Sequence, residues 1–417
     1  MTTTVAKAEE QGLLPPDEAR GHAPNWSGVL AMSLCVFALI ASEFMPVSLL
    51  TPIARDLRVT EGMAGQGIAI SGAFAVLTSL TISWLAGGMN RKTLLLTLTG
   101  VMAVSGAIVA LAPNYLVYMV GRALIGVVIG GFWSMAAATA MRLVPVSQVP
   151  KALAVFNGGN ALATVVAAPL GSYLGSIVSW RGAFFSLVPI ALLAFAWQWV
   201  SLPSMQAKPR GSSSGNVFRL LKNRTVALGM AASGIFFMGQ FTLFTYVRPF
   251  LETVTRVDVT ALSLILLVIG VAGLVGTTFI GVFLKRGLYP TLIAIPVLMA
   301  VIALALIPVG SWVITVTVLL GLWGLMATAA PVGWWSWVAH ATAENAESGG
   351  GLMVAVIQLS IALGSTVGGV LFDTSGYRST FGASAAVLLL AAFLAFLTWR
   401  SQAPKTSATL TQVGKGT

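Results

Sequence analysis

Residues Ser42–Pro52 read SEFMPVSLLTP, and they close an apolar run that starts at Trp26 and continues to Leu50. Glu43 stands inside this run, and no other Asp or Glu falls within an apolar run of comparable length. A carboxylate at bilayer depth costs about 2.5–3.5 kcal/mol on insertion scales, so it usually marks a functional site. The stretch therefore predicts a membrane-spanning helix that carries one buried acid.

The composition places the whole chain in the membrane class. Hydrophobic residues make up 57% of the 417 residues and charged residues 8%, and the mean hydropathy is +0.91. A soluble domain carries about 25% charged residues. Acidic residues precede the first run, which is long enough to span a bilayer, so we expect it to be retained rather than cleaved as a signal. The single Cys35 excludes an internal disulfide.

Apolar runs of spanning length recur along the chain, and each is expected to form a helix that satisfies its own backbone. They lie near residues 27–50, 63–85, 93–112, 116–141, 153–175, 182–200, 225–250, 260–284, 291–308, 312–337, 350–371 and 380–399. The sequence thus predicts an all-α integral membrane protein, with twelve transmembrane helices in two six-helix bundles. The predicted parts are a tail at 1–25, bundles at 26–200 and 225–400, a polar basic linker at 201–224, and a tail at 401–417.

The basic residues predict the orientation. With both termini inside, sixteen Lys and Arg lie on the inner side and five in outer loops, namely Arg55, Arg58, Arg181, Arg256 and Arg378. This asymmetry fits the positive-inside rule, so we expect a multi-pass protein of the cell inner (plasma) membrane with cytoplasmic termini. The net charge of +11 is spread over many short loops. It therefore indicates topology, and nucleic acid is not expected as a partner.

Arg122 is the predicted partner of Glu43. Each residue lies about 10 Å from the outer end of its helix at about 1.5 Å per residue. An acid and a base at matched depth lower each other's burial cost, so we expect an ion pair. The balance between desolvation and pairing decides whether Glu43 exchanges protons near neutral pH, and a purely structural pair is the alternative. The following Gly126 and Gly130 share one helix face and predict close helix packing.

Other polar and aromatic residues at helical depth are candidates for contact with a solute. Amides in apolar runs seek partners on a neighbouring helix or on a polar ligand, and aromatic rings offer flat stacking surfaces. The candidates are Trp133, Asn157, Asn160, Gln240, Tyr246, Arg248, Trp334 and Gln358. Arg248 could equally extend to the interface. Prolines near the ends of helices 1 and 7, Pro46 and Pro249, predict helix breaks at corresponding positions and a binding site between the halves.

The sequence lacks the motifs that several classes of protein require. The sequence has no Gly-x4-Gly-Lys-Ser/Thr phosphate loop for an ATP-driven pump. His22 and His340 both fall outside the predicted helices, so no metal or haem site is expected. No cluster of nucleophile and base suggests an enzyme. We therefore expect a secondary transporter without a cofactor, in which Glu43 couples protons or contacts the solute.

These motifs resemble the major facilitator superfamily over about residues 25–400. Arg122-x3-Gly126 matches its helix 4 arginine motif, and the segment Ala168–Gly171, with Pro169, is similar to the helix 5 motif of its antiporters. Glu43–Pro52 resembles the helix 1 signature of the purine ribonucleoside efflux permeases, in the drug:proton antiporter branch. Further segments share that likeness: Gly130–Met135, Phe244–Pro249, Pro331–Trp334 and Val354–Leu359.

The resemblance implies proton-driven export of purine nucleosides such as inosine and guanosine, or of related purines, by alternating access. Its expected partners are that small-molecule solute, protons and the lipid bilayer, and a monomer is expected. Two alternatives stay open. One is a broad drug or sugar exporter of the same fold. The other is a non-transporting membrane sensor with a signalling partner at the linker or the tails.

Overall fold

The computed structural model describes residues 24–85, 88–135, 139, 142–145, 148–206, 217–342 and 346–402. Within these ranges all regular structure is helical. The elements in chain order are α2 (Trp26–Leu57), α3 (Glu61–Leu85), α4 (Arg91–Ala110), α5 (Tyr115–Trp133), α7 (Val149–Ile177), α8 (Ser179–Phe185), α9 (Leu187–Ser201), η2 (Val217–Lys222), α10 (Arg224–Phe244), α11 (Val247–Phe250), η3 (Leu251–Thr255), α12 (Val259–Arg286), α13 (Leu288–Val309), α14 (Val313–Ala341) and α15 (Ala346–Gln402).

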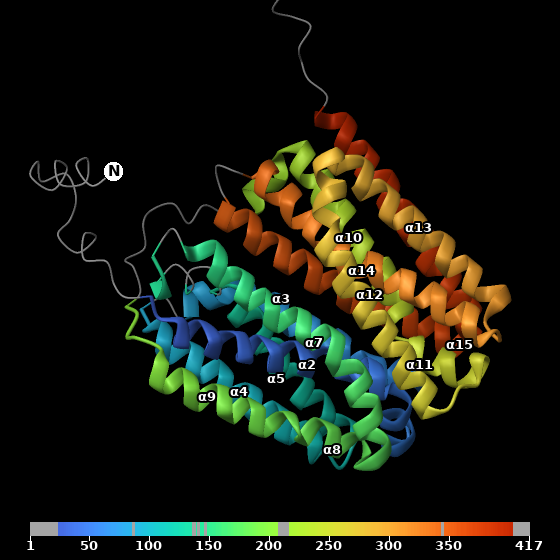
Figure 1. Ribbon diagram of the computed structural model, residues 1–417, viewed down its shortest axis with the longest axis horizontal. Helices are drawn as coiled ribbons and strands as arrows, with labels where there is room; N and C mark the ends of the chain where they lie inside the picture. Colours follow the sequence, from blue (N-terminus) through green and yellow to red (C-terminus); the bar gives the residue numbers. More distant parts are fainter. Residues whose placement is uncertain are drawn as a thin grey trace, which may run out of the picture.

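Figure 1 shows α2 to α9 gathered in one part of the molecule and α10 to α15 in the other. We call residues 24–206 the first half and residues 217–402 the second half. The side on which α2 begins and α15 ends is the terminal side, and the side on which α2 ends and α3 begins is the hairpin side. The boundaries at 26–200 and 225–400 stay predictions. Most of the expected tails, and the middle of the expected linker, lie outside the described residues.

The described residues contain eleven helices long and apolar enough to cross a membrane. The last of them, α15, is 57 residues long and has a non-helical backbone at Gly376, with φ 76° and ψ −179°. A straight helix of that length would extend about 85 Å, whereas the hydrocarbon core is about 30 Å thick. The two helices predicted at 350–371 and 380–399 therefore both fall within α15, on either side of Gly376.

The predicted end of helix 1 is wrong. α2 continues through both Pro46 and Pro52 to Leu57, where Arg58 closes it in the left-handed region with φ 55°. The polar residues after Leu50 ended the apolar run but not the helix. In the second half the predicted break exists, because α10 stops at Phe244 and a short α11 and a π-helical turn follow. Thus only the second of the two expected breaks is present.

Two further helix boundaries differ from the prediction. α5 ends at Trp133 rather than near residue 141, and part of the segment that follows lies outside the described residues. His340 was expected outside the helices but lies in the last turn of α14.

Helix starts follow ordinary capping chemistry: the side chains of Asn114 and Asp258 accept from the backbone N–H three residues on, at 3.0 and 2.8 Å.

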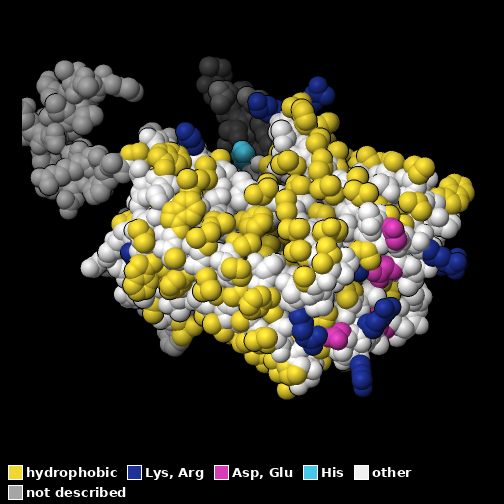
Figure 2. Space-filling model, turned by 60° about the horizontal axis from the view of Figure 1, so that its bottom comes forward, with side chains coloured by type: hydrophobic (Ala, Val, Ile, Leu, Met, Phe, Trp, Pro, Cys, Tyr) yellow, Lys and Arg dark blue, Asp and Glu magenta, His cyan; other side chains and the backbone are white. Residues whose placement is uncertain are grey.

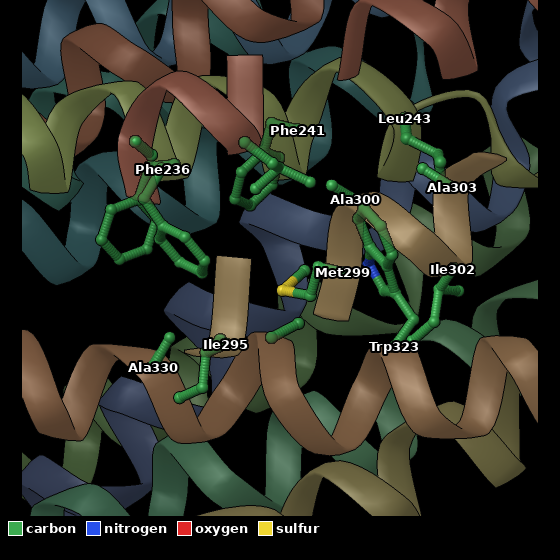
Figure 3. Packing of buried hydrophobic residues seen from close by; sticks show 14 of the residues in the cluster. Phe236, Phe241, Leu243, Ile295, Met299, Ala300, Ile302, Ala303, Trp323 and Ala330 are labelled. Carbon is green, nitrogen blue, oxygen red and sulfur yellow. The ribbon is translucent and has the colours of Figure 1, made fainter. Parts of the chain in front are cut away.

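Apolar side chains both fill the interior and cover the outside. Figure 3 shows the largest buried cluster, in which Phe236 and Phe241 of α10 lie near residues of α13 and α14 such as Met299 and Trp323. Figure 2 shows a broad hydrophobic surface, with charged side chains gathered toward its edges. α12 contributes exposed residues at helical spacing, including Leu264, Val271 and Phe279. An apolar surface of this extent suits contact with lipid.

Close packing of α5 on α3 depends on glycine. A Cβ at Gly126 would collide with the Ser71 carbonyl and approach the Cβ of Phe74 to 2.9 Å. A Cβ at Gly130 would collide with the Ala75 carbonyl. Backbone cannot give way as a flexible side chain can, so these glycines let the two helices approach closely. This contact places Arg122, one turn before Gly126, against α2 and α3.

We predict that Gly126→Ala lowers the stability of the protein by about 1–3 kcal/mol, because the added methyl overpacks the α3–α5 contact. Gly158→Ala is the matched control, since a Cβ at that position of α7 meets nothing within 4 Å. The control should be neutral or stabilising by up to about 1 kcal/mol from helix propensity. Thermal unfolding of the purified variants in detergent measures both. Equal melting temperatures for the two would contradict the packing role.

Candidate functional site

Arg122 is the centre of the polar structure in the first half, and it is 1% exposed. Its Nε donates to the Gly67 carbonyl at 2.9 Å and its Nη1 to the Ser42 carbonyl at 2.6 Å. Its Nη2 donates to the Glu43 carbonyl at 3.0 Å and to the Ser71 hydroxyl at 3.2 Å. One guanidinium on α5 thereby joins α2 and α3.

Pro46 explains why Ser42 needs this donor. In an α-helix the carbonyl of residue 42 accepts from the N–H of residue 46, and proline has none. The Ser42 carbonyl is therefore left without its helical partner inside the membrane, where such a group costs several kcal/mol. Arg122 supplies the missing hydrogen bond and allows α2 to pass through Pro46 without a break.

Glu43 and Arg122 meet, but not as the predicted ion pair. Arg122 binds the backbone oxygen of Glu43, and the ion pairs within the described part of the chain are Arg181–Asp56 and Arg248–Glu252. The Glu43 side chain turns instead to the second half, where its Oε1 accepts from the Gln358 Nε2 of α15 at 3.2 Å. Glu43 is 3% exposed. The carboxylate therefore lies at the seam between the halves.

Two amides of the second half have unsatisfied acceptors: Gln358, which meets Glu43 at this seam, and Gln240 of α10. The Oε1 atoms of Gln240 and Gln358 are buried without a hydrogen-bond partner in the structure. A ring stack at 5.7 Å joins Phe44 and Phe241, the residues that directly follow Glu43 and Gln240. Buried acceptors of this kind favour a ligand that brings N–H or O–H donors. We call Glu43, Gln240, Gln358, Phe44 and Phe241 the seam cluster.

The other predicted solute contacts differ in burial and in their partners. Asn157 is exposed and donates to the Leu153 carbonyl of its own helix, and Asn160 and Trp133 are half-buried. Trp334 is 2% exposed and packs edge-on against Trp337. No hydrogen bond among the described residues links any of these four to the cluster. They stay candidates by position alone.

Tyr246 and Arg248 pack where the halves meet on the hairpin side. Tyr246 donates to the Ser365 carbonyl at 2.7 Å and stacks on Phe372. Arg248 does not extend to the interface, because it is 5% exposed and pairs with Glu252 at 2.8 Å. Pro249 follows it in the short α11. Both side chains therefore have protein partners rather than an open site.

The helix 5 motif packs against α2. Pro169 lies inside α7, which continues to Ile177. A Cβ at Gly171 would approach the Ser48 hydroxyl to 2.8 Å and the Met45 Cγ to 3.2 Å. The motif thus lies directly beside the proline-containing part of α2, and its small residue lets the two helices come together.

Sequence reasoning missed the acceptors on α3. Gly67 and Ser71 are four residues apart and share the helix face that receives Arg122. The spacing of small residues along α3 was a usable signal for this close face. Asp373 was also missed: it reaches from α15 to Thr60 at 2.6 Å and to the Gly62 N–H at 3.0 Å. No local pattern pairs residues that far apart in sequence.

Comparison with known proteins gives the family. Residues 32–355 match the model described as the Major Facilitator Superfamily. The chain is 69% identical over 383 residues to the transcription regulatory protein OpdE of Pseudomonas aeruginosa, covering 91% of this chain and 95% of that protein. It is 40% identical over 371 residues to the purine ribonucleoside efflux pump NepI of Salmonella typhimurium, covering 89% and 93%.

Solved structures agree on the fold. The nucleoside transporter NupG superposes with a TM-score of 0.73 at 12% identity, covering 89% of this chain and 99% of that one. A bacterial homolog of the human lysosomal transporter Spinster, inward-facing and unoccupied, superposes with a TM-score of 0.68 at 17% identity, covering 91% and 98%. Together with the sequence matches, these confirm the predicted resemblance.

We predict that Arg122→Gln destabilises the protein by at least about 1–3 kcal/mol, the cost of leaving the Ser42 carbonyl buried without a donor. Adding Pro46→Ala should restore part of this loss, because residue 46 then carries an N–H that reaches the same carbonyl. Melting temperatures of the four proteins in a double-mutant cycle measure the coupling. If Pro46→Ala changes the melting temperature equally with and without Arg122, the stabilising role of Arg122 does not depend on its bond to the Ser42 carbonyl.

Proposed function

The chain belongs to the major facilitator superfamily, and from that premise we propose that it is a proton-driven antiporter that exports purine ribonucleosides such as inosine and guanosine, or related purines, by alternating access. The observation that carries the proposal is the contact of the Glu43 carboxylate with Gln358 across the seam between the halves. The 40% identity to NepI, a purine ribonucleoside efflux pump by name, supports the solute class.

The coupling step follows from the hydrogen-bonding capacity of the two side chains. An ionised Glu43 only accepts, so it holds the Gln358 Nε2 as a donor. Proton entry from outside turns one carboxyl oxygen into a donor and removes the charge. The neutral carboxyl keeps an accepting oxygen but binds the Gln358 amide less strongly than the carboxylate does, so the contact between the halves weakens. We propose that protonation releases the solute and that deprotonation toward the cytoplasm resets the carrier.

The seam cluster also suits a flat solute that forms hydrogen bonds. The free Oε1 atoms of Gln240 and Gln358 accept, and a purine base and its ribose both supply N–H or O–H donors. Phe44 and Phe241 stack on each other at the same level, and the half-buried Phe44 could offer its outer face to a flat solute. In this proposal Arg122 positions the Glu43 backbone, and Trp133, Asn157, Asn160 and Trp334 are secondary candidates for solute contact.

The setting of the transporter belongs to the same proposal. Positive-inside asymmetry supports an inner-membrane protein with cytoplasmic termini, so the hairpin side would face outward. The proposed units are two six-helix bundles at 26–200 and 225–400, joined by a cytoplasmic linker at 201–224. The proposed partners are the nucleoside, protons and lipid, and we propose a monomer that needs no cofactor.

A second candidate function rests on the similarity to OpdE. At 69% identity over 383 residues, a protein named as a transcription regulator shares nearly the whole chain. This favours a regulatory role in which the membrane protein reports on a solute, with a signalling partner at the linker or the tails. The two candidates differ in one measurable quantity, the net flux of solute.

We predict that Glu43→Gln reduces pH-driven inosine flux to the level of protein-free liposomes, because the amide cannot take up and release the coupling proton. Purified protein in liposomes with an imposed pH gradient and labelled inosine provides the measurement. Glu61→Gln is the control, since this carboxylate lies at the start of α3 outside the seam cluster and its removal should leave flux unchanged.

The same assay separates the alternatives. Wild-type flux in the Glu43→Gln variant would rule out the coupling role. Flux of arabinose or chloramphenicol in place of inosine would assign a sugar or drug exporter. Absence of flux for every solute, from protein that is correctly inserted, would favour the regulatory candidate.

A further inference from the structure

Pro52 creates a second carbonyl in α2 without its helical donor. The Ser48 carbonyl would accept from the N–H of residue 52, and proline has none. The donor here is the Arg248 Nη1, which reaches from α11 in the second half to α2 in the first. Arg248 lies in α11, directly after the helix break that follows Phe244.

Arg248 brings its own counter-charge. Its Nε lies 2.8 Å from the Glu252 Oε1, four residues further along the same segment. The two side chains therefore stay together when the halves move apart. Splitting a buried ion pair is costly because it leaves an unpaired charge. Breaking the contact with Ser48 avoids this cost, since Arg248 keeps Glu252 as its partner. The Arg248–Ser48 hydrogen bond can therefore form and break without separating the ion pair.

Asp373 makes a second contact of the same type on the hairpin side. It accepts from the Thr60 hydroxyl at 2.6 Å and from the Gly62 N–H at 3.0 Å. Gly62 lies in the first turn of α3, where backbone N–H groups have no acceptor within the helix. Here too, a charged side chain of the second half meets a backbone group of the first half that helix geometry leaves without a partner.

These contacts share one side of the molecule. The hydrogen bonds that we find between the halves in the described residues are Gln358–Glu43, Thr366–Gln66, Arg248–Ser48 and those of Asp373 with Thr60 and Gly62. They run from the seam cluster to the hairpin side. Tyr246 fills the space beside them, against Gly65 of α3 and Gly369 of α15. We call Arg248, Asp373 and their backbone partners the clamp.

We propose that Arg248 and Asp373 are positioning residues of the transport cycle, which hold the hairpin side closed through backbone groups left free by Pro52 and by the start of α3. The inference rests on the proposed function only in requiring alternating access. It assigns Arg248 to closure of the molecule rather than to the solute. Arg248 carries most of the effect because it is buried, whereas the Asp373 contact is exposed.

The test measures the distance between the halves directly. Spin labels go at Met63 of α3 and Thr260 of α12, two exposed positions on the hairpin side of different halves. The background is Cys35→Ser, which replaces the thiol beside Thr99 with a hydroxyl that can make the same hydrogen bond. Pulsed electron–electron distance measurements then give the ratio of open to closed molecules. The readout needs no solute.

Arg248→Gln should raise the open-to-closed ratio about tenfold, since a hydrogen bond from a charged group is lost. Pro52→Ala should raise it by less, about threefold, because the new N–H competes for the Ser48 carbonyl without removing the arginine. This second variant favours the helix, so it should fold even if the first does not. Arg181→Gln is the matched control: that arginine also meets a carboxylate, Asp56, and a carbonyl, Ala112, but all within the first half.

Unchanged distances in Arg248→Gln and Pro52→Ala would overturn the proposal. An equal rise in Arg181→Gln would overturn it too, because any lost arginine would then loosen this side. The clamp variants could open the hairpin side although the wild-type protein transports no nucleoside. That result would support the clamp proposal and contradict the proposed solute. Normal nucleoside flux in the wild-type protein, together with unchanged distances in the clamp variants, would support the proposed solute and contradict the clamp proposal.

Discussion

A backbone carbonyl inside a membrane needs a hydrogen-bond donor, and α2 contains two that its own helix cannot serve. Pro46 and Pro52 free the carbonyls of Ser42 and Ser48, and Arg122 and Arg248 bind them. One arginine comes from the same half and the other from the opposite half. The first contact fixes α2 within its bundle of neighbours, while the second joins it to the rest of the molecule. The position of Glu43 depends on both, because it lies between the two serines.

The helices were largely predictable, since hydrocarbon demands long apolar segments and leaves a clear record in the sequence. The count differs only because both last helices fall within α15. Helix ends were less accessible. Apolar runs stop where polarity begins, but a helix stops where its hydrogen bonding stops, and α2 continues seven residues past Leu50 to Leu57. Pro46 looked like a break because the arginine that compensates for it lies on another helix.

The site was half predictable for a related reason. Burial identified Glu43 and Arg122 as unusual, and matched depth indicated that they meet. Depth says nothing about rotation around a helix axis, however, so the ion pair was wrong and the bond to the Glu43 carbonyl was not foreseen. The true partner of the carboxylate, Gln358, lies 315 residues away in sequence. Such a pairing is a product of how the halves meet, and one sequence does not record it.

The Arg248–Glu252 pair has an electrical consequence. Moving one elementary charge through a membrane potential of 100 mV changes the energy by about 2.3 kcal/mol. An arginine alone at this depth would make its movement respond to the voltage across the cell membrane. Because Glu252 follows four residues later on the same segment, the two charges travel together and their sum is zero. In the proposed cycle, opening of the Arg248 contact would therefore move no net charge through the membrane potential, so this step would not depend on whether the cell is energised or depolarised.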